Sequence, residues 1–251
     1  MSNSEFIDVT CDQGVMKIGI NRPDKKNALN RAMYDAIRSA FLIADQDPQI
    51  KSVLLYGTAD AFTAGNDLAD FNDRDPSKPS PAAVMLEVIH DFSKPVVAAV
   101  AGLAVGIGAT ILLHCDLVYA APETRFRLPF VALGVCPEAG SSLMVPALAG
   151  HRLASELLML GDFFTSQTAL DAGFVTRIVA DQDIKAFGFE KAVQLAQQPV
   201  EALSITKRLL KQGQHQVLKE RMTEEFMLFN QMLQSDESIA VRQKLSAKLK
   251  K

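Results

Sequence analysis

Residues 95–116 read PVVAAVAGLAVGIGATILLHCD, and the first nineteen of them carry no charged side chain. A run of that length is long enough to cross a membrane. However, it opens with the β-branched pattern PVVAAV and then meets glycines at positions 102, 106 and 108 before a second apolar run. A buried strand, a glycine-rich loop and a buried helix explain this order better. The stretch therefore predicts an α/β fold and no membrane span.

The glycine loop matches neither of the common nucleotide-binding motifs. Ile111 stands where the pattern G-x-G-x-x-G requires its last glycine, and the Gly-Lys-Ser/Thr ending of a P-loop does not occur. The glycines are also what close packing of a helix against a strand requires.

A second junction of the same kind lies in AFTAGNDLADF (61–71). Gly65 releases the backbone just before a predicted short helix whose first turn holds Asp67. Free backbone N–H groups at such a junction can hold an anion or an oxyanion. A tight turn capped by Asp67 explains the pattern equally well. Two such junctions in one chain are more informative, because two N–H groups that converge on one oxygen make an oxyanion hole.

The remaining patterns alternate between strands and helices, as expected of an α/β core followed by a helical tail. FIDVTCDQGVMKIGIN (6–21) predicts a β-hairpin, and RAMYDAIRSAFLIADQ predicts a helix capped by Asn30. RDPSKPSPAA (74–83) predicts an exposed, mobile loop. Further strands are predicted at 51–57, 95–100, 116–120, 124–129 and 174–179, and further helices at 82–92, at 107–114, through most of the chain after Pro137, and from 199 onward.

Composition narrows the class of protein. Apolar residues make up 48% of the chain and charged residues 22%, with a net charge of −3. This is typical of a soluble globular protein and argues against nucleic acid as the main partner. Three widely spaced cysteines predict neither a disulfide framework nor a zinc site. The four histidines form no metal-binding spacing, so we expect surface or satisfied core histidines and no metal.

Targeting signals are not evident. The N-terminus lacks the pattern of a secretory signal, and Ala247-Lys248-Leu249 is not terminal. We therefore expect a cytoplasmic protein. The last ten residues carry five Lys or Arg and no acid, which is typical of a solvated helical end.

Four motifs in order resemble the crotonase (enoyl-CoA hydratase/isomerase) superfamily. They are NRPDKKNALN, FTAGNDLADF, VAGLAVGIGATILLHCDLVYA and FRLPFVALGVCPEAGSS. The resemblance implies a crotonase-type ββα spiral core over 1–198 and a helical trimerisation region over 199–251. It implies an acyl-CoA substrate, a homotrimer or dimer of trimers, and no cofactor apart from the coenzyme A carried by the substrate.

The resemblance also assigns roles to residues. The oxyanion-hole amides fall at Asn66 and Ile107, where glycine is commoner than isoleucine. The early segment, with Ala28, lines the CoA site, and Lys25 or Lys26 meets a phosphate. The backbone from Ala64 through Gly65, Asn66 and Asp67 to Leu68 holds the adenine and thioester ends. Phe71, Phe130 and the 74–92 region shape the acyl pocket.

The sequence departs from the hydratases of this superfamily in one important respect. Their two glutamates match Thr110 and Phe130 here, and neither side chain can act as a carboxylate base. Glu138, in GVCPEAGSS, stands where the Δ3,Δ2-enoyl-CoA isomerases of the peroxisomal type carry their catalytic glutamate. The resemblance therefore implies isomerisation of 3-enoyl-CoA to trans-2-enoyl-CoA, with Glu138 as proton shuttle.

Two other interpretations of Glu138 and of the chain stay open. Pro137 as the first residue of a helix, with Glu138 in its first turn, is a common helix start. Burial among apolar residues predicts a raised pKa for Glu138, whereas a helix N-terminus predicts a lowered one. The chain as a whole could instead hydrolyse thioesters, act as a weak hydratase, or bind acyl-CoA without turnover.

Overall fold

The computed structural model describes residues 4–67, 69–70, 80–180 and 184–249, with side chains up to residue 244. Its strands are β1 (Ile7–Asp12), β2 (Val15–Ile20), β3 (Ser52–Tyr56), β4 (Ala61–Thr63), β5 (Val96–Val100), β6 (Leu103–Val105), β7 (Leu117–Ala120), β8 (Arg125–Arg127), β9 (Phe163–Thr165) and β10 (Arg177–Ile178). Its helices are α1 (Arg31–Gln46), α3 (Pro81–Asp91), α4 (Ile107–Thr110), α5 (Ser141–Ser155), α6 (Ser166–Asp171), α7 (Ile184–Ala196), α8 (Val200–Gln212), α9 (His215–Leu233) and α10 (Asp236–Leu249). Shorter helical turns are η1 (Pro23–Lys25), η2 (Ile111–His114), η3 (Val131–Leu133) and η4 (Glu156–Leu160).

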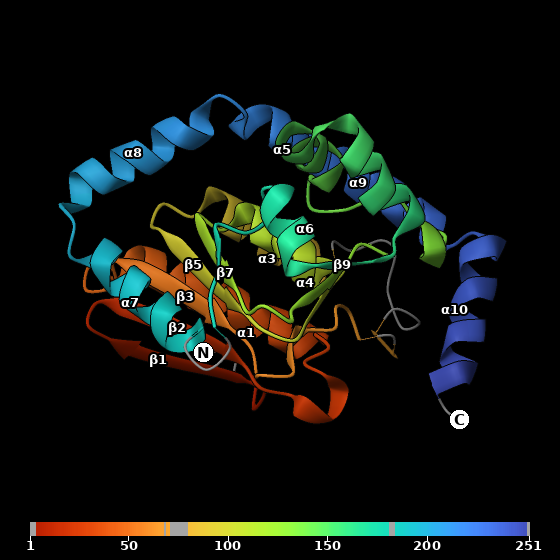
Figure 1. Cartoon of the computed structure of the whole chain (residues 1–251), viewed down its shortest axis with the longest axis horizontal. Helices are drawn as coiled ribbons and strands as arrows, with labels where there is room; N and C mark the ends of the chain where they lie inside the picture. The colour runs from red at the N-terminus through yellow and green to blue at the C-terminus, as the bar shows by residue number, and fades with distance from the viewer. Residues whose placement is uncertain (1–3, 68, 71–79, 181–183, 250–251) are drawn as a thin grey trace.

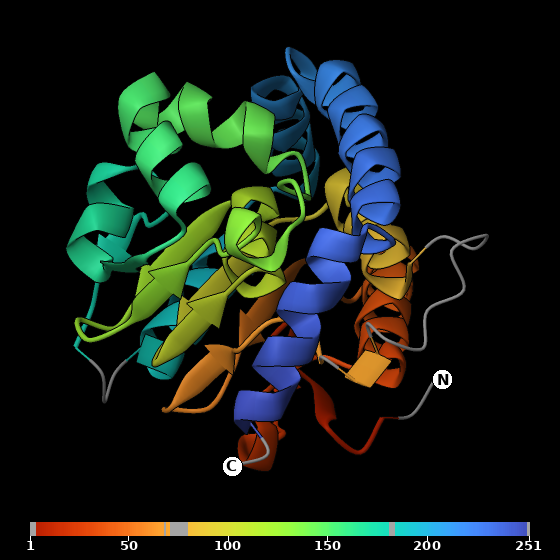
Figure 2. The same cartoon turned by 90° about the vertical axis from the view of Figure 1, so that its right-hand side faces the viewer.

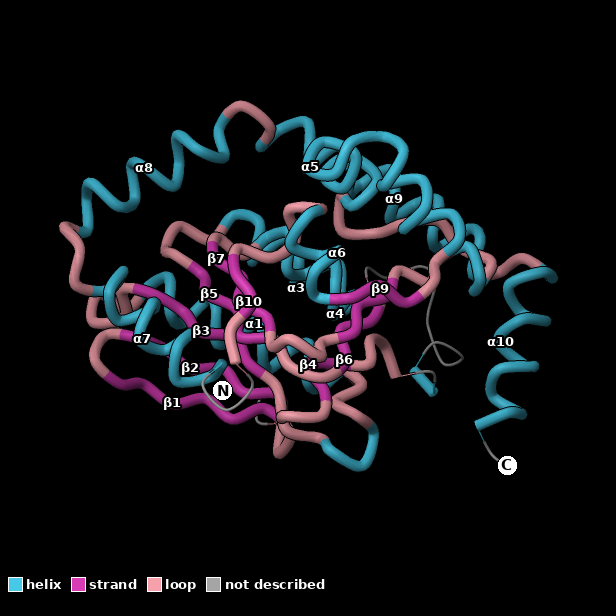
Figure 3. Tube along the Cα trace, viewed as in Figure 1, coloured by secondary structure: helices cyan, strands magenta, loops and turns pink. Residues whose placement is uncertain are grey.

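The strands form two sheets that the chain visits in turn (Figures 1 and 3). The larger sheet has the order β1-β2-β3-β5-β7-β10 and the smaller has the order β4-β6-β8-β9. From β3 the chain passes to β4, from β5 to β6, and from β7 to β8, so each turn places one strand in each sheet. This repeated step is the predicted ββα spiral, and the predicted mixed α/β class is confirmed.

The larger sheet is buried on both faces, which explains its nearly continuous apolar strands. Val53 and Leu55 of β3 belong to the main core with α1 and α3, whereas Leu54 between them packs with α7 on the opposite face. The same alternation runs along β5, since successive side chains of a strand point to opposite faces. Figure 2 shows the sheet between these layers.

Several sequence predictions need adjustment. Of the strand expected at 174–179, only Arg177 and Ile178 pair, as a parallel edge beside β7. Phe174 and Val175 instead close the end of α6, where both N–H groups bind the carbonyl of Ala169. Three short strands were not predicted: β4, β6 and β9. Each has three residues, which is too short to show a period of two. The loop predicted at 74–83 lies mostly outside the described residues, and α3 begins inside it, at Pro81, after the cap Ser80.

The nineteen-residue uncharged stretch begins with the predicted buried strand and ends in the predicted helical turns, but the short strand β6 lies within its predicted glycine-rich loop. One other segment, Ser141–Leu160, is long and apolar enough to cross a membrane by length and composition. It is not one straight helix, because Gly150 has φ 75° and ψ 159° inside it. Since such a helix is weak evidence by itself, we assign no membrane span from it.

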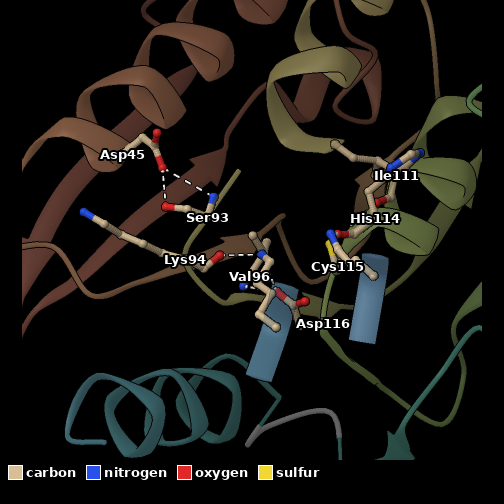
Figure 4. Close-up of polar contacts among 10 residues, drawn as sticks. Asp45, Ser93, Lys94, Val96, Ile111, His114, Cys115 and Asp116 are labelled. Carbon is tan, nitrogen blue, oxygen red and sulfur yellow. Dashed lines mark hydrogen bonds and ion pairs between the residues drawn. The ribbon is translucent and has the colours of Figure 1, made fainter. Parts of the chain in front are cut away.

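The helical tail is tied to the sheet by a buried lysine. Lys207 of α8 donates hydrogen bonds to the Lys94 carbonyl and, over 2.8 Å, to the Asp116 carboxylate. Asp116 also accepts from the Val96 N–H, at 2.7 Å, as Figure 4 shows. Beyond this anchor, α8 spans one side of the molecule and leads to α9 (Figure 1). The predicted region boundary at residue 198 falls between α7 and α8.

Candidate active site

The two predicted strand-to-helix junctions lie side by side. They follow β4 and β6, which are parallel neighbours, so both junctions leave the smaller sheet at its carboxyl edge. A Cβ on Gly65 would lie 2.8 Å from the carbonyl oxygen of Val105, and a Cβ on Gly108 would lie 2.7 Å from that of Thr63. Glycine is therefore required at both positions because the two junctions approach at backbone distance.

Only one backbone N–H in the segment 64–67 has no acceptor among the described residues. Ala64 donates to the carbonyl of Lys26, Gly65 to the Thr63 hydroxyl, and Asp67 to the carbonyl of Leu29. The remaining N–H belongs to Asn66. Since Asn66 forms a parallel bridge with Leu29 through its neighbours, its own N–H points away from Leu29, toward the side where β6 lies.

The second junction leaves a similar group. Gly106 donates to the carbonyl of Arg127, and both Ala109 and Thr110 donate to the carbonyl of Gly106. Ile107 is the first residue of α4, so its N–H has no intrahelical acceptor, and no other described residue accepts from it. Its side chain is fully buried, so the backbone alone is available for chemistry.

The helix predicted to start at Pro137 starts later, which corrects the helix-cap interpretation of Glu138. α5 begins at Ser141 after Gly140. Ala139 and Gly140 have φ of 61° and 72°, and a right-handed helix cannot continue through two left-handed residues. Glu138 therefore stands on a tight turn before the helix. A non-glycine residue in this conformation costs roughly 1–2 kcal/mol, and such strain is concentrated at functional sites.

Glu138 and Asn66 line the same cavity, which has a volume of about 350 Å³. Its wall combines apolar side chains from α1, α3 and α9 with a few polar ones: Leu29, Arg31, Tyr34, Asn66, Asp70, Ser80, Pro81, Ala82, Ala83, Leu86, Glu87, Glu138, Ala139, Met222, Thr223, Phe226 and Phe229. Neither Ile107 nor Phe130 belongs to this lining, and Phe130 is 3% exposed. Phe130 is thus buried in the core beside this cavity lining, and its predicted contact with substrate stays a prediction.

Thr110 lies beside the candidate base. Its hydroxyl is 3.3 Å from Oε1 of Glu138 and 3.3 Å from the carbonyl of Gly106. The residue that replaces the first hydratase glutamate thus donates a hydrogen bond toward the carboxylate of Glu138. Thr110 and Glu138, 28 residues apart in the sequence, therefore lie side by side in one site.

Tyr34 is a site residue that the sequence did not reveal. Its hydroxyl donates to Oδ1 of Asn66 at 2.6 Å, and its ring lines the cavity. Burial, and then the charges of Glu138 and Asp70, raise the pKa of Tyr34 well above its ordinary value. The phenol therefore stays protonated and acts as a donor. Tyr34 falls on the apolar face of a helix, so its pattern indicates only a core residue.

The turn that carries Glu138 is held from two sides by residues distant in sequence. Nε2 of His114 lies 2.8 Å from the carbonyl of Ala139, and the Glu225 carboxylate accepts from the Gly140 N–H. Burial lowers the pKa of His114 to about 3, so the imidazole is neutral and Nε2–H donates to this carbonyl. In the sequence, these contacts could have been suspected only from Glu225, an acid that falls among the apolar residues on the buried face of a helix.

An ion pair and the hydrogen bonds of the buried Asn27 side chain fix the predicted CoA segment. Arg22 donates to Asp67 at 2.7 Å and to the carbonyl of Ala28 at 2.9 Å. Burial alone would raise the pKa of Asp67, but the Ala69 N–H and Arg22 outweigh it and lower that pKa. Lys25 is exposed at the end of η1. Leu68 and Phe71, also predicted to contact substrate, lie outside the described residues.

Three of the four histidines, His90, His114 and His215, lie together, and two of them fit our expectation: the His215 side chain is 40% exposed and buried His114 has a hydrogen-bond partner. The rings of His90 and His215 stack at 4.3 Å, and His215 pairs with Asp91 at 3.0 Å. Nε2 of His90 is buried without a hydrogen-bond partner among the described residues, so His90 is not the satisfied core histidine we predicted. The ligand atoms of His90, Asp91 and His215 lie within 4.8 Å of one another. Because the two rings are nearly parallel, their in-plane lone pairs do not converge on one point.

The fold and the order of its elements define a member of the crotonase superfamily. A model of the enoyl-CoA hydratase/isomerase family matches residues 10–250, and the chain belongs to that family. The crystal structure of an enoyl-CoA hydratase/isomerase from Pseudoalteromonas atlantica T6c superposes with a TM-score of 0.93 at 36% identity, covering 97% of this chain and 98% of that one.

Two curated relatives illustrate the range of reactions. Enoyl-CoA delta isomerase 2 of Homo sapiens is 36% identical over 241 residues, which cover 93% of this chain and 61% of that protein. The chain thus spans less than two thirds of this relative's length. The 2,3-dehydroadipyl-CoA hydratase of Escherichia coli K12 is 32% identical over 233 residues, which cover 90% and 89%. The choice of reaction therefore depends on the residues of this chain.

Proposed function

We propose that the protein is a Δ3,Δ2-enoyl-CoA isomerase that converts 3-enoyl-CoA to trans-2-enoyl-CoA. The observation that carries the proposal is that Glu138 lines one cavity with Asn66, while Thr110 and Phe130 replace the carboxylates of a hydratase. A double-bond shift needs one base and no water. Hydration needs a water molecule that is both activated and positioned.

The proposed reaction is a proton transfer through one carboxylate. Glu138 removes a proton from C2 of the substrate, and the electron pair of that C–H bond moves into conjugation with the thioester. The resulting dienolate takes the proton back from Glu138 at C4, and the double bond then lies between C2 and C3. Thr110 donates to Oε1 at 3.3 Å, which helps to hold the carboxylate in place within the site.

The two backbone amides stabilise the intermediate in this scheme. The negative charge of the dienolate lies mainly on the thioester oxygen, and the unpaired N–H groups of Asn66 and Ile107 are the donors for it. Each fixed donor of this kind contributes roughly 3–4 kcal/mol to transition-state stabilisation. These donors and Glu138 belong to the protein, so the scheme uses no metal or redox cofactor.

A kinetic comparison tests the assignment. Purified wild-type protein is mixed with 3-hexenoyl-CoA, and formation of the conjugated enoyl-CoA is followed by absorbance. We expect turnover in wild type and about a 10³-fold lower kcat in Glu138→Gln. Glu190→Gln, an exposed acid on α7, is the control and should match wild type. Loss of activity in Glu87→Gln but not in Glu138→Gln would show that the base is Glu87 and that the proposed role of Glu138 is wrong.

The same preparation separates the rival reactions. A thioesterase releases free CoA, which a thiol reagent detects. A hydratase consumes trans-2-hexenoyl-CoA, so its conjugated absorbance falls. Binding of acyl-CoA without any of these three signals would indicate a non-catalytic protein, and the isomerase assignment would then be wrong.

We further propose that the chain assembles as a homotrimer. The helices α5, α8 and α9 run along one side of the molecule (Figures 1 and 2). That region and the segments beside it expose large apolar side chains: Leu148, Met159, Leu160, Phe163, Val200, Ile205, Leu209, Leu210, Val217, Met227, Leu228 and Met232. Exposed apolar groups at this density are typical of an interaction surface. Light scattering after gel filtration should give a mass three or six times that of the 27.3 kDa chain.

A further inference from the structure

Glu225 is a buried acid with no role in the proposed proton transfer. It lies on α9 and is 4% exposed. The same helix lines the cavity through Met222 and Phe229. A buried carboxylate is costly unless hydrogen bonds compensate it, so its contacts indicate what it stabilises.

Both oxygens of Glu225 bind the turn that follows Glu138. Oε2 accepts from the Gly140 N–H at 2.6 Å, and Oε1 accepts from the Ser142 N–H at 2.9 Å. Arg221, one turn earlier on α9, reaches the Ser142 hydroxyl at 3.2 Å. These N–H groups belong to the start of α5, where Gly140 has no side chain to cap the helix. The carboxylate of a distant helix thus supplies the missing cap.

The two-point contact fixes the direction of the turn. One hydrogen bond would allow the segment to rotate, but two N–H groups on two oxygens of one carboxylate define its orientation. Glu138 lies two residues before Gly140, and the left-handed Ala139 and Gly140 lie at the pivot. An error of about 1 Å in the place of a catalytic group can cost on the order of 10² in rate.

We propose that Glu225 is a positioning residue for Glu138, so that the C-terminal helical region is part of the active site. This inference rests on the proposed role of Glu138 as the base. Burial raises the pKa of Glu225, while hydrogen bonds from Ser142 and Gly140, and the charge of Arg221, oppose that effect. Substitution by glutamine removes one acceptor oxygen and turns an N–H donor toward a backbone N–H.

The test compares Glu225→Gln with Glu220→Gln, an exposed acid on the same helix. Both variants are assayed with 3-hexenoyl-CoA beside wild type, and circular dichroism checks folding. We expect Glu225→Gln to lower kcat at least tenfold with KM changed less than about threefold. Glu220→Gln should match wild type. If Glu225→Gln fails to fold, Glu225→Asp replaces it, since aspartate keeps the charge but is too short to reach both N–H groups.

A double variant distinguishes positioning from general destabilisation. If Glu225 acts through Glu138, adding Glu225→Gln to Glu138→Gln should lower the residual rate less than twofold. A loss of the same size in both backgrounds, or full activity in a folded Glu225→Gln protein, would overturn the inference. Wild-type protein without isomerase activity would instead overturn the proposed function.

Discussion

The hydroxyl of Tyr34 lies 2.6 Å from Oδ1 of Asn66, across 32 residues of sequence. This hydrogen bond joins the first turn of α1 to the junction that follows β4. It fixes the side chain of the residue whose backbone N–H faces the candidate oxyanion site. The position of that N–H therefore depends on how α1 packs against the sheet.

Replacing Tyr34 by phenylalanine should weaken catalysis more than binding. The ring still fills its place in the cavity wall, but Oδ1 of Asn66 loses its donor. A neutral hydrogen bond contributes about 1 kcal/mol, so we expect kcat to fall roughly fivefold and KM to change little. Steady-state kinetics with 3-hexenoyl-CoA measures both quantities. An unchanged kcat would mean that the phenol does not help to orient Asn66.

Alanine at Gly65 should damage both the fold and the site. Gly65 has φ 93°, and a new Cβ would meet the carbonyl of Val105 at 2.8 Å. We expect a loss of roughly 1–3 kcal/mol in the free energy of unfolding, with a loss of activity beyond that caused by unfolding.

Gly213 provides the matched control for this substitution. It has φ −64° and no neighbouring atom within 4 Å of a new Cβ. Gly213→Ala should leave stability equal or raised by about 0.5 kcal/mol, because alanine restricts the unfolded chain. Urea denaturation of both variants gives the comparison. Equal effects at the two positions would contradict the close approach of the junctions.

His114 should make stability depend on pH in the acidic range. Burial lowers its pKa to about 3 from 6.5, with the Ala139 carbonyl opposing and Lys211 and His90 adding to the effect. Above pH 6.5 the imidazole is neutral in both states, and its contribution is fully present. As pH falls from 6.5 toward 3, the unfolded state takes up the proton first, and up to about 5 kcal/mol of stability is lost.

The variant His114→Gln isolates this contribution, because glutamine donates a hydrogen bond but does not titrate. The difference in the free energy of unfolding between wild type and variant should shift in favour of the variant as pH is lowered from 7 to 4. Urea titrations at several pH values measure it. A difference that stays constant over this range would contradict the prediction.

Lys207 should be needed to hold α8 on the sheet. Replacing it by methionine removes the hydrogen bonds from this buried side chain to the Lys94 carbonyl and to Asp116, whose own side chain is 24% exposed, and we expect a loss of roughly 1–3 kcal/mol in the free energy of unfolding. Lys219→Met removes an exposed pair with Asp91 and should cost less than about 1 kcal/mol. Hydrogen exchange should show faster exchange in 200–212 for the first variant alone. Equal exchange in both would mean that apolar contacts hold α8.

Local patterns were sufficient for much of the fold. The hairpin of β1 and β2, the helix α1 with its Asn30 cap, and the order of β5, α4 and η2 all follow from periodicity, capping and glycine placement. The three-residue strands β4, β6 and β9 did not, because pairing with neighbours in the sheet, not their own sequence, makes them strands. The predicted start of α5 was wrong because Glu225, a buried acid on a distant helix, takes the place of a local cap.

The sequence by itself determined the alternation of strands and helices, the glycines at the two junctions, and the presence of one acid, Glu138, in a stretch without other charges. These features depend on backbone sterics and on residue type within a few positions. Only the tertiary structure decided that Glu138 shares a cavity with Asn66, that Tyr34 holds Asn66, and that Glu225 caps α5 across 85 residues. Such contacts form when distant elements pack together, and no local pattern contains the distance between them.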